Sequence, residues 1–289
     1  MVAVVELSAG PGTTAAYARA ALGMVPGFGR SGDTLPDVEV RRRGVTVDRA
    51  HLAAYDRVCG FRLTDTLPAT YPHVLAFPLA MRLMTAPDFP LPLIGLVHVT
   101  NRITVHRPIP SGAALDLSVR AADLRAHPRG RQFDIVATAT LDGAEVWRGL
   151  STYLRLGPPR ADDPAPPARP AADDGAEADD GTGAGGVWRV LARVGADYAA
   201  VSGDRNPIHT SWLGARLFGF PRPIAHGMWS KAHALAALEG RLPDAYTVDV
   251  AFRKPLLLPA RATFTTTATA TGWSFALVSR GPHLTGTIT

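Results

Sequence analysis

Three polar side chains of the kinds that move protons lie within six residues in the second half of the chain. They are Asp204, Asn206 and His209, in the stretch SGDRNPIH. A neutral imidazole beside a carboxylate suits general acid–base chemistry near neutral pH. Polar groups packed this closely between apolar runs cost free energy unless they are paired or functional. The spacing therefore marks a candidate acid–base site.

The same stretch predicts the start of a helix. In the Asn-Pro pair at residues 206–207, the Asn can cap a helix and the Pro suits its first turn. We expect this helix to run to about Phe218, which places His209 in the first turn, where the helix dipole disfavours a charged imidazole. A plainer interpretation stays open, in which Asp204 and the Asn only cap the helix while His209 packs.

A second helix is predicted at residues 226–238, because this stretch is rich in Ala and Leu, lacks Pro and is followed by Gly240. Residues 77–84 take the corresponding place in the first half. Alternating or β-branched patterns predict strands at residues 95–105, 115–124, 133–141 and 145–156, and then at 187–194, 247–256 and 262–270. One helix with several long antiparallel strands per half predicts an α+β fold, in which the sheet wraps the helix.

The two halves of the chain resemble each other. Residues 52–63 (LAAYDRVCGFRL) match residues 196–207 (ADYAAVSGDRNP), and residues 105–119 match residues 252–266. Several matching segments in the same order predict a duplicated domain.

The polar candidates occur in only one of the two copies. Phe61 stands where the second half has Asp204, and Phe77 is followed by Pro where the second half has His226-Gly227. A Pro at that position also lacks the backbone N–H that Gly227 has. The sequence thus predicts one working site beside a retired copy.

The halves are separated by residues 157–186, a Pro-, Ala-, Gly- and Asp-rich segment that we expect to be a disordered linker. The predicted domains are therefore residues 1–156 and 187–289. Outside the linker the chain carries 28 basic and 18 acidic residues, which favours an anionic partner. Its dense basic runs lack interleaved aromatic residues, so nucleic acid is not expected.

The composition, 46% hydrophobic and 19% charged, is typical of a globular protein. No run of 18 apolar residues predicts a membrane span, and the first ten residues do not resemble a signal peptide. The single cysteine, Cys59, rules out an internal disulfide and is expected to be buried. A cytoplasmic protein is the expectation.

The run from Tyr198 to His209 resembles the motif of the MaoC-like (R)-specific enoyl-thioester hydratases, and residues 219–228 (GFPRPIAHGM) resemble the start of their central helix. The first half resembles the degenerate half of members with a double hot-dog fold. Within the family, the chain is most similar to actinobacterial (3R)-hydroxyacyl-thioester dehydratases. The resemblance covers nearly the whole chain outside the linker and the first thirty or so residues.

This resemblance implies an α+β double hot-dog fold and a hydro-lyase of fatty-acid metabolism. The implied reaction is reversible syn hydration of a trans-2-enoyl thioester to the (3R)-3-hydroxyacyl thioester, carried on CoA or an acyl-carrier protein. The alternatives that stay open are a hot-dog acyl thioesterase and a non-catalytic acyl-binding subunit. No cofactor, metal or membrane is implied, and a homodimer is compatible with the resemblance.

The resemblance also implies roles for individual residues. Asp204 and His209 would hold the catalytic water, and the Gly227 N–H would donate to the thioester oxygen, as an oxyanion hole requires. Supporting positions are Asn206, Ser202 and Tyr198. From the retired half we expect an apolar wall of the acyl tunnel, formed by Phe61, Phe77, Met81 and Met84.

A metal site is the remaining alternative. His226 and His233 lie seven residues apart on the predicted helix and could join His209. No HxxxH pair or carboxylate cluster accompanies them, so a metal is not expected.

Overall fold

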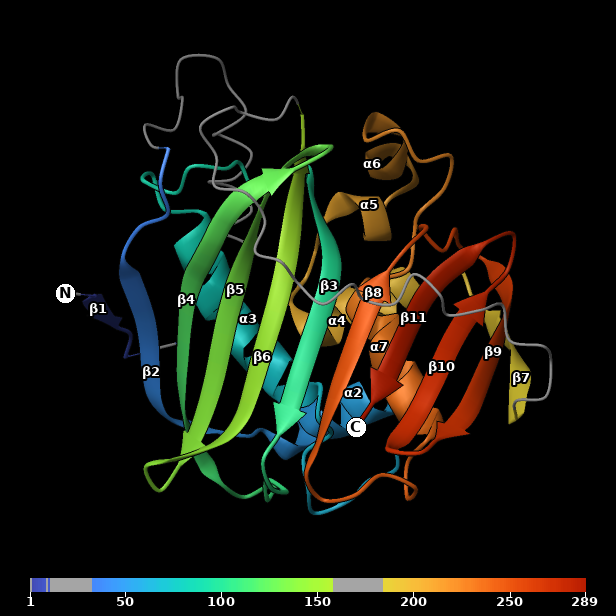
Figure 1. The fold of residues 1–289 in the computed structure, drawn as a ribbon, viewed down its shortest axis with the longest axis horizontal. Coiled ribbons are helices and arrows are strands. Elements are labelled where there is room, and N and C mark those ends of the chain that lie inside the picture. Colours follow the sequence, from blue (N-terminus) through green and yellow to red (C-terminus); the bar gives the residue numbers. More distant parts are fainter. Residues whose placement is uncertain (1, 9, 11–32, 158–183) are drawn as a thin grey trace.

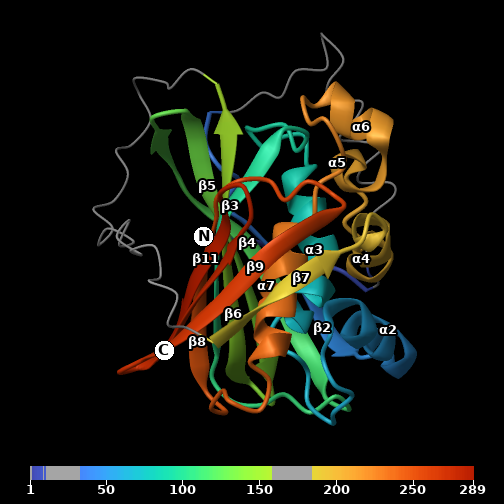
Figure 2. The ribbon, with the colours of Figure 1, turned by 90° about the vertical axis from the view of Figure 1, so that its right-hand side faces the viewer.

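The computed structural model describes residues 2–8, 10, 33–157 and 184–289. A single 11-stranded sheet curves around two central helices, α3 (Tyr71–Met84) and α7 (Gly227–Ala237) (Figure 1). Four further helices lie on the same side of the sheet, beyond α3 and α7 (Figure 2): α2 (Arg49–Cys59), α4 (Val194–Ser202), α5 (Pro207–Thr210) and α6 (Trp212–Leu217). This arrangement confirms the predicted α+β class.

The sheet joins the two halves edge to edge. In spatial order its strands are β1 (Ala3–Glu6), β2 (Val38–Thr46), β4 (Ala114–His127), β5 (Gly130–Leu141), β6 (Ala144–Leu156), β3 (Leu96–Val105), β8 (Tyr246–Phe252), β11 (Pro282–Ile288), β10 (Gly272–Val278), β9 (Ala260–Thr269) and β7 (Ala184–Val190). The β1–β2 pair is parallel and the other pairs are antiparallel. Strands β3 and β8 pair at the seam, where Asn101 lies opposite Val250.

The strands form because their side chains alternate between a helix-facing side and a solvent-facing side. In β4, Leu115, Leu117 and Val119 are buried while the residues between them are exposed or half-buried. Trp147 of β6 anchors the core, because its Nε1 donates a hydrogen bond to the Ala69 carbonyl at 2.7 Å. The result is a continuous apolar layer between the sheet and helix α3.

The internal repeat has a direct structural counterpart in α2 and α4. Both helices end at a glycine in the left-handed region, Gly60 at φ 88° and Gly203 at φ 75°. A side chain with a Cβ is strained there, which explains why both copies keep glycine. The two helices also pack together, with the rings of Tyr55 and Tyr198 6.3 Å apart between centroids.

Two predicted helices have different bounds in the structure. Helix α3 begins at Tyr71, six residues before the expected start, with Pro72 in its first turn and Pro78 inside it. The helix predicted from residue 207 to 218 is broken into α5 and α6, because Ser211 adopts an extended conformation (φ −134°, ψ 132°). Its Oγ accepts a hydrogen bond from the Gly214 N–H at 3.2 Å, so Ser211 ends one helix and caps the next.

The end of the predicted linker also differs. Strand β7 starts at Ala184, so residues 184–186 pair with β9 instead of belonging to the linker. The strand ends at Val190, before the predicted end at residue 194, where α4 begins. The rest of the predicted linker, residues 158–183, lies outside the described residues. In the described part of the chain, every helix falls short of a membrane span in length or in apolar character. Cys59 is buried with a free thiol, as expected.

Candidate active site

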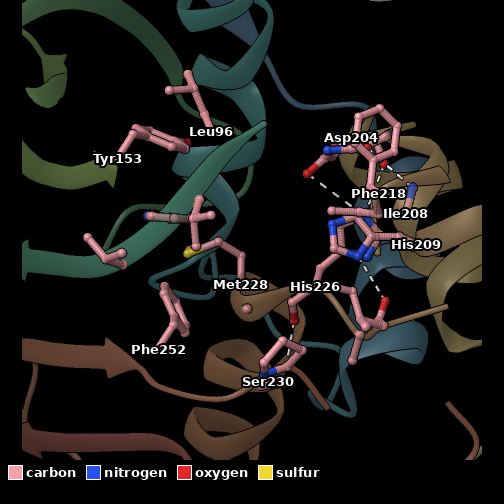
Figure 3. A pocket seen from close by; sticks show the side chains of 18 of the residues that line it. Leu96, Tyr153, Asp204, Ile208, His209, Phe218, His226, Met228, Ser230 and Phe252 are labelled. Carbon is pink, nitrogen blue, oxygen red and sulfur yellow. Dashed lines mark hydrogen bonds and ion pairs between the residues drawn. The ribbon is translucent and has the colours of Figure 1, made fainter. Parts of the chain in front are cut away.

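Asp204, His209 and His226 meet at one end of an internal cavity of about 640 Å³. Figure 3 shows them together, with Leu96 and Tyr153 at the opposite end. Asp204 lies in the loop after α4, His209 in α5, and His226 immediately before α7. Three separate elements therefore deliver the polar groups to one place.

Local hydrogen bonds hold the Asp204 loop in shape. The Asp204 N–H donates to the Ser202 Oγ at 3.2 Å, and the Asp204 Oδ1 accepts from the Asn206 N–H at 3.2 Å. Asn206 caps α5, because its Oδ1 accepts from the Ile208 N–H at 3.3 Å. The predicted cap is thus confirmed, and Ser202 shapes the turn.

One ring nitrogen of His209 faces a backbone carbonyl. Nδ1 lies 2.8 Å from the Ile224 oxygen. Because a carbonyl only accepts hydrogen bonds, Nδ1 carries the proton and Nε2 keeps its lone pair. Burial lowers the pKa of His209, while the nearby Asp204 carboxylate acts in the opposite direction. The imidazole is therefore neutral, with a basic nitrogen available to a ligand.

His226 joins the polar cluster, although the sequence suggested no catalytic role for it. It is 2% exposed, its ring stacks on His209 with centroids 3.7 Å apart, and its Nε2 donates to the Asp204 carbonyl at 3.0 Å. Burial lowers the pKa of His226 to about 3, so the ring is neutral. A signal for it existed in the sequence, because the first half has Phe77 at the matching position.

Gly227 is the first residue of α7 and lines the cavity. A Cβ at this position would lie 2.9 Å from the Phe252 ring. Glycine therefore lets the helix start approach the cavity closely, and a helix start is favourable for negative charge.

The remaining predicted residues fall into two groups. Tyr198 and three of the four proposed tunnel residues, Phe77, Met81 and Met84, line the cavity. Phe61 is not among the lining residues; its ring stacks against Tyr55 at 6.4 Å between centroids. We therefore remove Phe61 from the proposed tunnel wall.

Two further histidines in the cavity wall were not predicted. His73 of α3 and His98 of β3 stack with centroids 6.3 Å apart, and His98 also stacks on Tyr153 at 4.6 Å. Burial lowers the pKa of His73 to about 4 and that of His98 to about 3. They add neutral polar groups to a mostly apolar wall.

The cluster of Asp204, His209 and His226 has the ligand types of a metal site, with ligand atoms within 4.8 Å of one another. The geometry does not suit one ion, because the two imidazole planes are stacked and tilted by only 27°. An imidazole nitrogen binds a metal that lies in the plane of its ring. Two planes so nearly parallel intersect too far from the rings for one zinc to lie about 2.0–2.1 Å from a nitrogen of each. His233, the third histidine of the sequence hypothesis, points elsewhere, with its Nδ1 2.8 Å from the Cys59 carbonyl.

Residues 192–279, which include the polar cluster, match the MaoC-like domain family. The chain is also 39% identical over 279 residues to 3-hydroxyacyl-thioester dehydratase X of Mycobacterium tuberculosis, covering 93% of this chain and 95% of that protein. The chain belongs to the MaoC-like dehydratase family.

Solved structures confirm the fold of this MaoC-like protein. A crystal structure of HtdX from Mycobacterium tuberculosis superimposes with a TM-score of 0.74 at 38% identity, covering 86% of this chain and 98% of that one. A MaoC-like dehydratase from Phytophthora capsici shares the fold, with a TM-score of 0.69 at 17% identity over 86% and 94% of the two chains. The double hot-dog architecture expected from the sequence is therefore confirmed.

Proposed function

We propose that this protein is a hydro-lyase that interconverts (3R)-3-hydroxyacyl thioesters and trans-2-enoyl thioesters in fatty-acid metabolism. The observation that carries the proposal is the pair of Asp204 and neutral His209 at the end of a largely apolar cavity, beside the start of helix α7. The relative at 39% identity is named a 3-hydroxyacyl-thioester dehydratase, which supports the same reaction.

In the hydration direction, a water between the Asp204 carboxylate and the His209 Nε2 donates its protons to both acceptors. Its oxygen attacks C3 of the enoyl thioester as one proton passes to the pair. The pair then delivers a proton to C2 on the same face, which gives syn addition. Dehydration follows the same steps in reverse: the C2 proton is removed, the C3–O bond breaks, and the hydroxyl leaves as water.

Attack at C3 places negative charge on the thioester oxygen. The N–H of Gly227, at the start of α7, is the proposed donor to that oxygen, because it lines the cavity at the positive end of the helix dipole. The close contact expected between a Cβ at this position and Phe252 supports the choice of glycine.

His226 would act as a positioning residue. Its stacking fixes the plane of the His209 ring, and its hydrogen bond fixes the backbone of Asp204. Ser202 and Asn206 hold the same loop from its other side. The acid–base pair is thus preorganised before the substrate binds.

The experiment follows hydration of crotonyl-CoA by the loss of enoyl absorbance, with free thiol measured in parallel. Asp204→Asn and His209→Gln should each lower kcat by at least about 100-fold, the low end for a positioned acid or base. Asp197→Asn is the matched control, because this half-buried carboxylate on α4 pairs with Arg193 and does not line the cavity.

Two outcomes would overturn the proposal. Release of free thiol without loss of the enoyl group would identify a thioesterase. Binding without turnover by the unmodified protein would identify an acyl-binding subunit. Chiral analysis of the product tests the stereochemistry, for which we expect the (3R) form.

A further inference from the structure

Helix α6 turns its large apolar residues toward solvent. Trp212, Leu213 and Leu217 are 55%, 62% and 75% exposed, whereas the buried residues of the helix are the small Gly214 and Ala215. A Cβ on Gly214 would come within 2.5 Å of the Pro207 Cβ, so α6 packs closely on α5 with its small face. This orientation is the reverse of an ordinary surface helix, whose apolar side faces the core.

The same surface is positively charged. Arg216 lies on the outer side of α6, with its guanidinium carbon 4.5 Å from the centroid of the Trp212 ring. No Asp or Glu occurs between Arg205 and Leu238. Four exposed basic residues also line the cavity and so mark its opening: Arg129, Arg205, Arg253 and Lys254.

The exposed helix adjoins the cavity directly. Phe218 follows Leu217 in the chain and lines the cavity, as does Phe220. Figure 3 shows Phe218 at the same end of the cavity as Asp204 and His209. A molecule seated on α6 would therefore lie beside the opening through which a thioester reaches the acid–base pair.

We propose that the α6 face, defined by Trp212, Leu213, Arg216 and Leu217, is the docking surface for an acidic acyl-carrier protein that presents the thioester on its phosphopantetheine arm. This inference rests on the proposed function and names the carrier. The basic rim suits the phosphates of either carrier. Trp212 and Arg216 suit a nucleotide as well as a protein, but Leu213 and Leu217 add exposed apolar area that suits a protein interface. The basic residues then give charge complementarity to an acidic protein.

A docking surface formed by four residues of one short helix suits a transient encounter. Product must leave and a new carrier must arrive in each cycle, which favours a small interface and electrostatic steering. The rate with the carrier protein should therefore fall more steeply with ionic strength than the rate with CoA.

The test compares one acyl group on two carriers. Hydration of the crotonyl thioester of an acyl-carrier protein and of CoA is measured for the unmodified protein, for Arg216→Glu and for Leu213→Ser combined with Leu217→Ser. We expect kcat/KM with the carrier protein to fall by at least about tenfold in both variants, roughly the 1.4 kcal/mol of a single interface contact. With CoA as carrier, kcat/KM of both variants should stay within about twofold of the value for the unmodified protein.

Strand β7 supplies matched controls at the far edge of the sheet. Val187 is an exposed apolar residue at 57%, and Arg189 is an exposed arginine. Val187→Ser and Arg189→Glu should leave both substrates unaffected. The docking surface would be overturned if the α6 variants lost kcat/KM equally with both carriers or lost none with either. The same loss of kcat/KM in the β7 variants would also overturn it.

The unmodified protein separates this inference from the proposed function. Turnover of crotonyl-CoA with none of the carrier-protein substrate would overturn the docking surface and leave the hydro-lyase intact. Failure to hydrate either substrate would overturn the proposed function itself.

Discussion

His73, His98 and His226 are imidazoles held neutral by their surroundings at the cavity. Their pKa values are lowered to about 4, 3 and 3, mainly by burial. An unfolded histidine titrates near 6.5, so below that pH the unfolded chain binds more protons than the native protein. Stability should therefore rise with pH between about pH 3 and pH 6.5.

Asp56 contributes with the opposite sign. Burial raises its pKa to about 6, so the native protein holds a proton that the unfolded chain releases above about pH 3.9. Its stabilising effect is lost as the pH rises from about 4 to 6. One carboxyl offsets only part of the effect of three imidazoles.

We expect the free energy of unfolding to be roughly 4–5 kcal/mol lower at pH 5 than at pH 7.5, as measured by urea denaturation. His98→Phe should reduce this pH dependence, because it removes one proton site and keeps the stacking on Tyr153 and Phe252. An unchanged pH dependence in His98→Phe would show that other groups cause the acid sensitivity.

At the scale of elements, helix α3 of the first half forms one side of the cavity wall. Its lining residues recur at helical spacing along one side: His73, Val74, Phe77, Met81 and Met84. Phe252 and Met228 also line the cavity (Figure 3). We propose that the acyl tail lies along α3 while its thioester end reaches Asp204 and His209.

Met84→Trp, which adds bulk to this wall, should lower kcat/KM for a dodecenoyl thioester at least about tenfold more than for a crotonyl thioester. The physical reason is that the larger ring fills space needed only by a long tail. A stability measurement accompanies the assay, because overpacking costs about 1–3 kcal/mol. Equal losses at both chain lengths in a folded variant would place the tail elsewhere.

At the scale of the molecule, a buried lysine ties the two halves together at the β3–β8 seam. Lys231 of α7 is fully buried. Its Nζ donates to the backbone carbonyl of Asn101 at 3.0 Å, to the Asn101 Oδ1 at 2.6 Å and to the backbone carbonyl of Val248 at 3.2 Å. Burial lowers the pKa of Lys231, and three acceptors match the three donors of an ammonium group. Asn101 is held in turn, because its Nδ2 donates to Ser151 Oγ at 3.0 Å.

Lys231→Met should lower the free energy of unfolding by about 2–3 kcal/mol, because it leaves buried oxygens without a donor. Combining it with Asn101→Leu should cost at least about 1 kcal/mol less than the sum of the single changes, since both partners are then removed. Lys254→Met is the exposed control and should change stability by less than about 0.5 kcal/mol. Strict additivity in the double variant would contradict the proposed coupling across the seam.

Short-range signals in the sequence determined the backbone around the candidate site. The Asn206 cap and the start of α7 were predicted because they depend on neighbouring residues, and the repeat matched the two segments that form α2 and α4. The same repeat indicated that only the second half carries the polar groups. The break at Ser211 was missed, although serine is itself a common helix cap.

Only the tertiary structure decided which side chains reach the site. His226 stacks on His209 and binds the Asp204 carbonyl because α7 packs against the α4–α5 loop, a contact between residues 22 positions apart. Phe61 stacks on Tyr55 instead of lining the cavity, and His73 and His98 face each other from α3 and β3. Such directions depend on how helices and sheet pack, which the spacing of residues along one element does not contain.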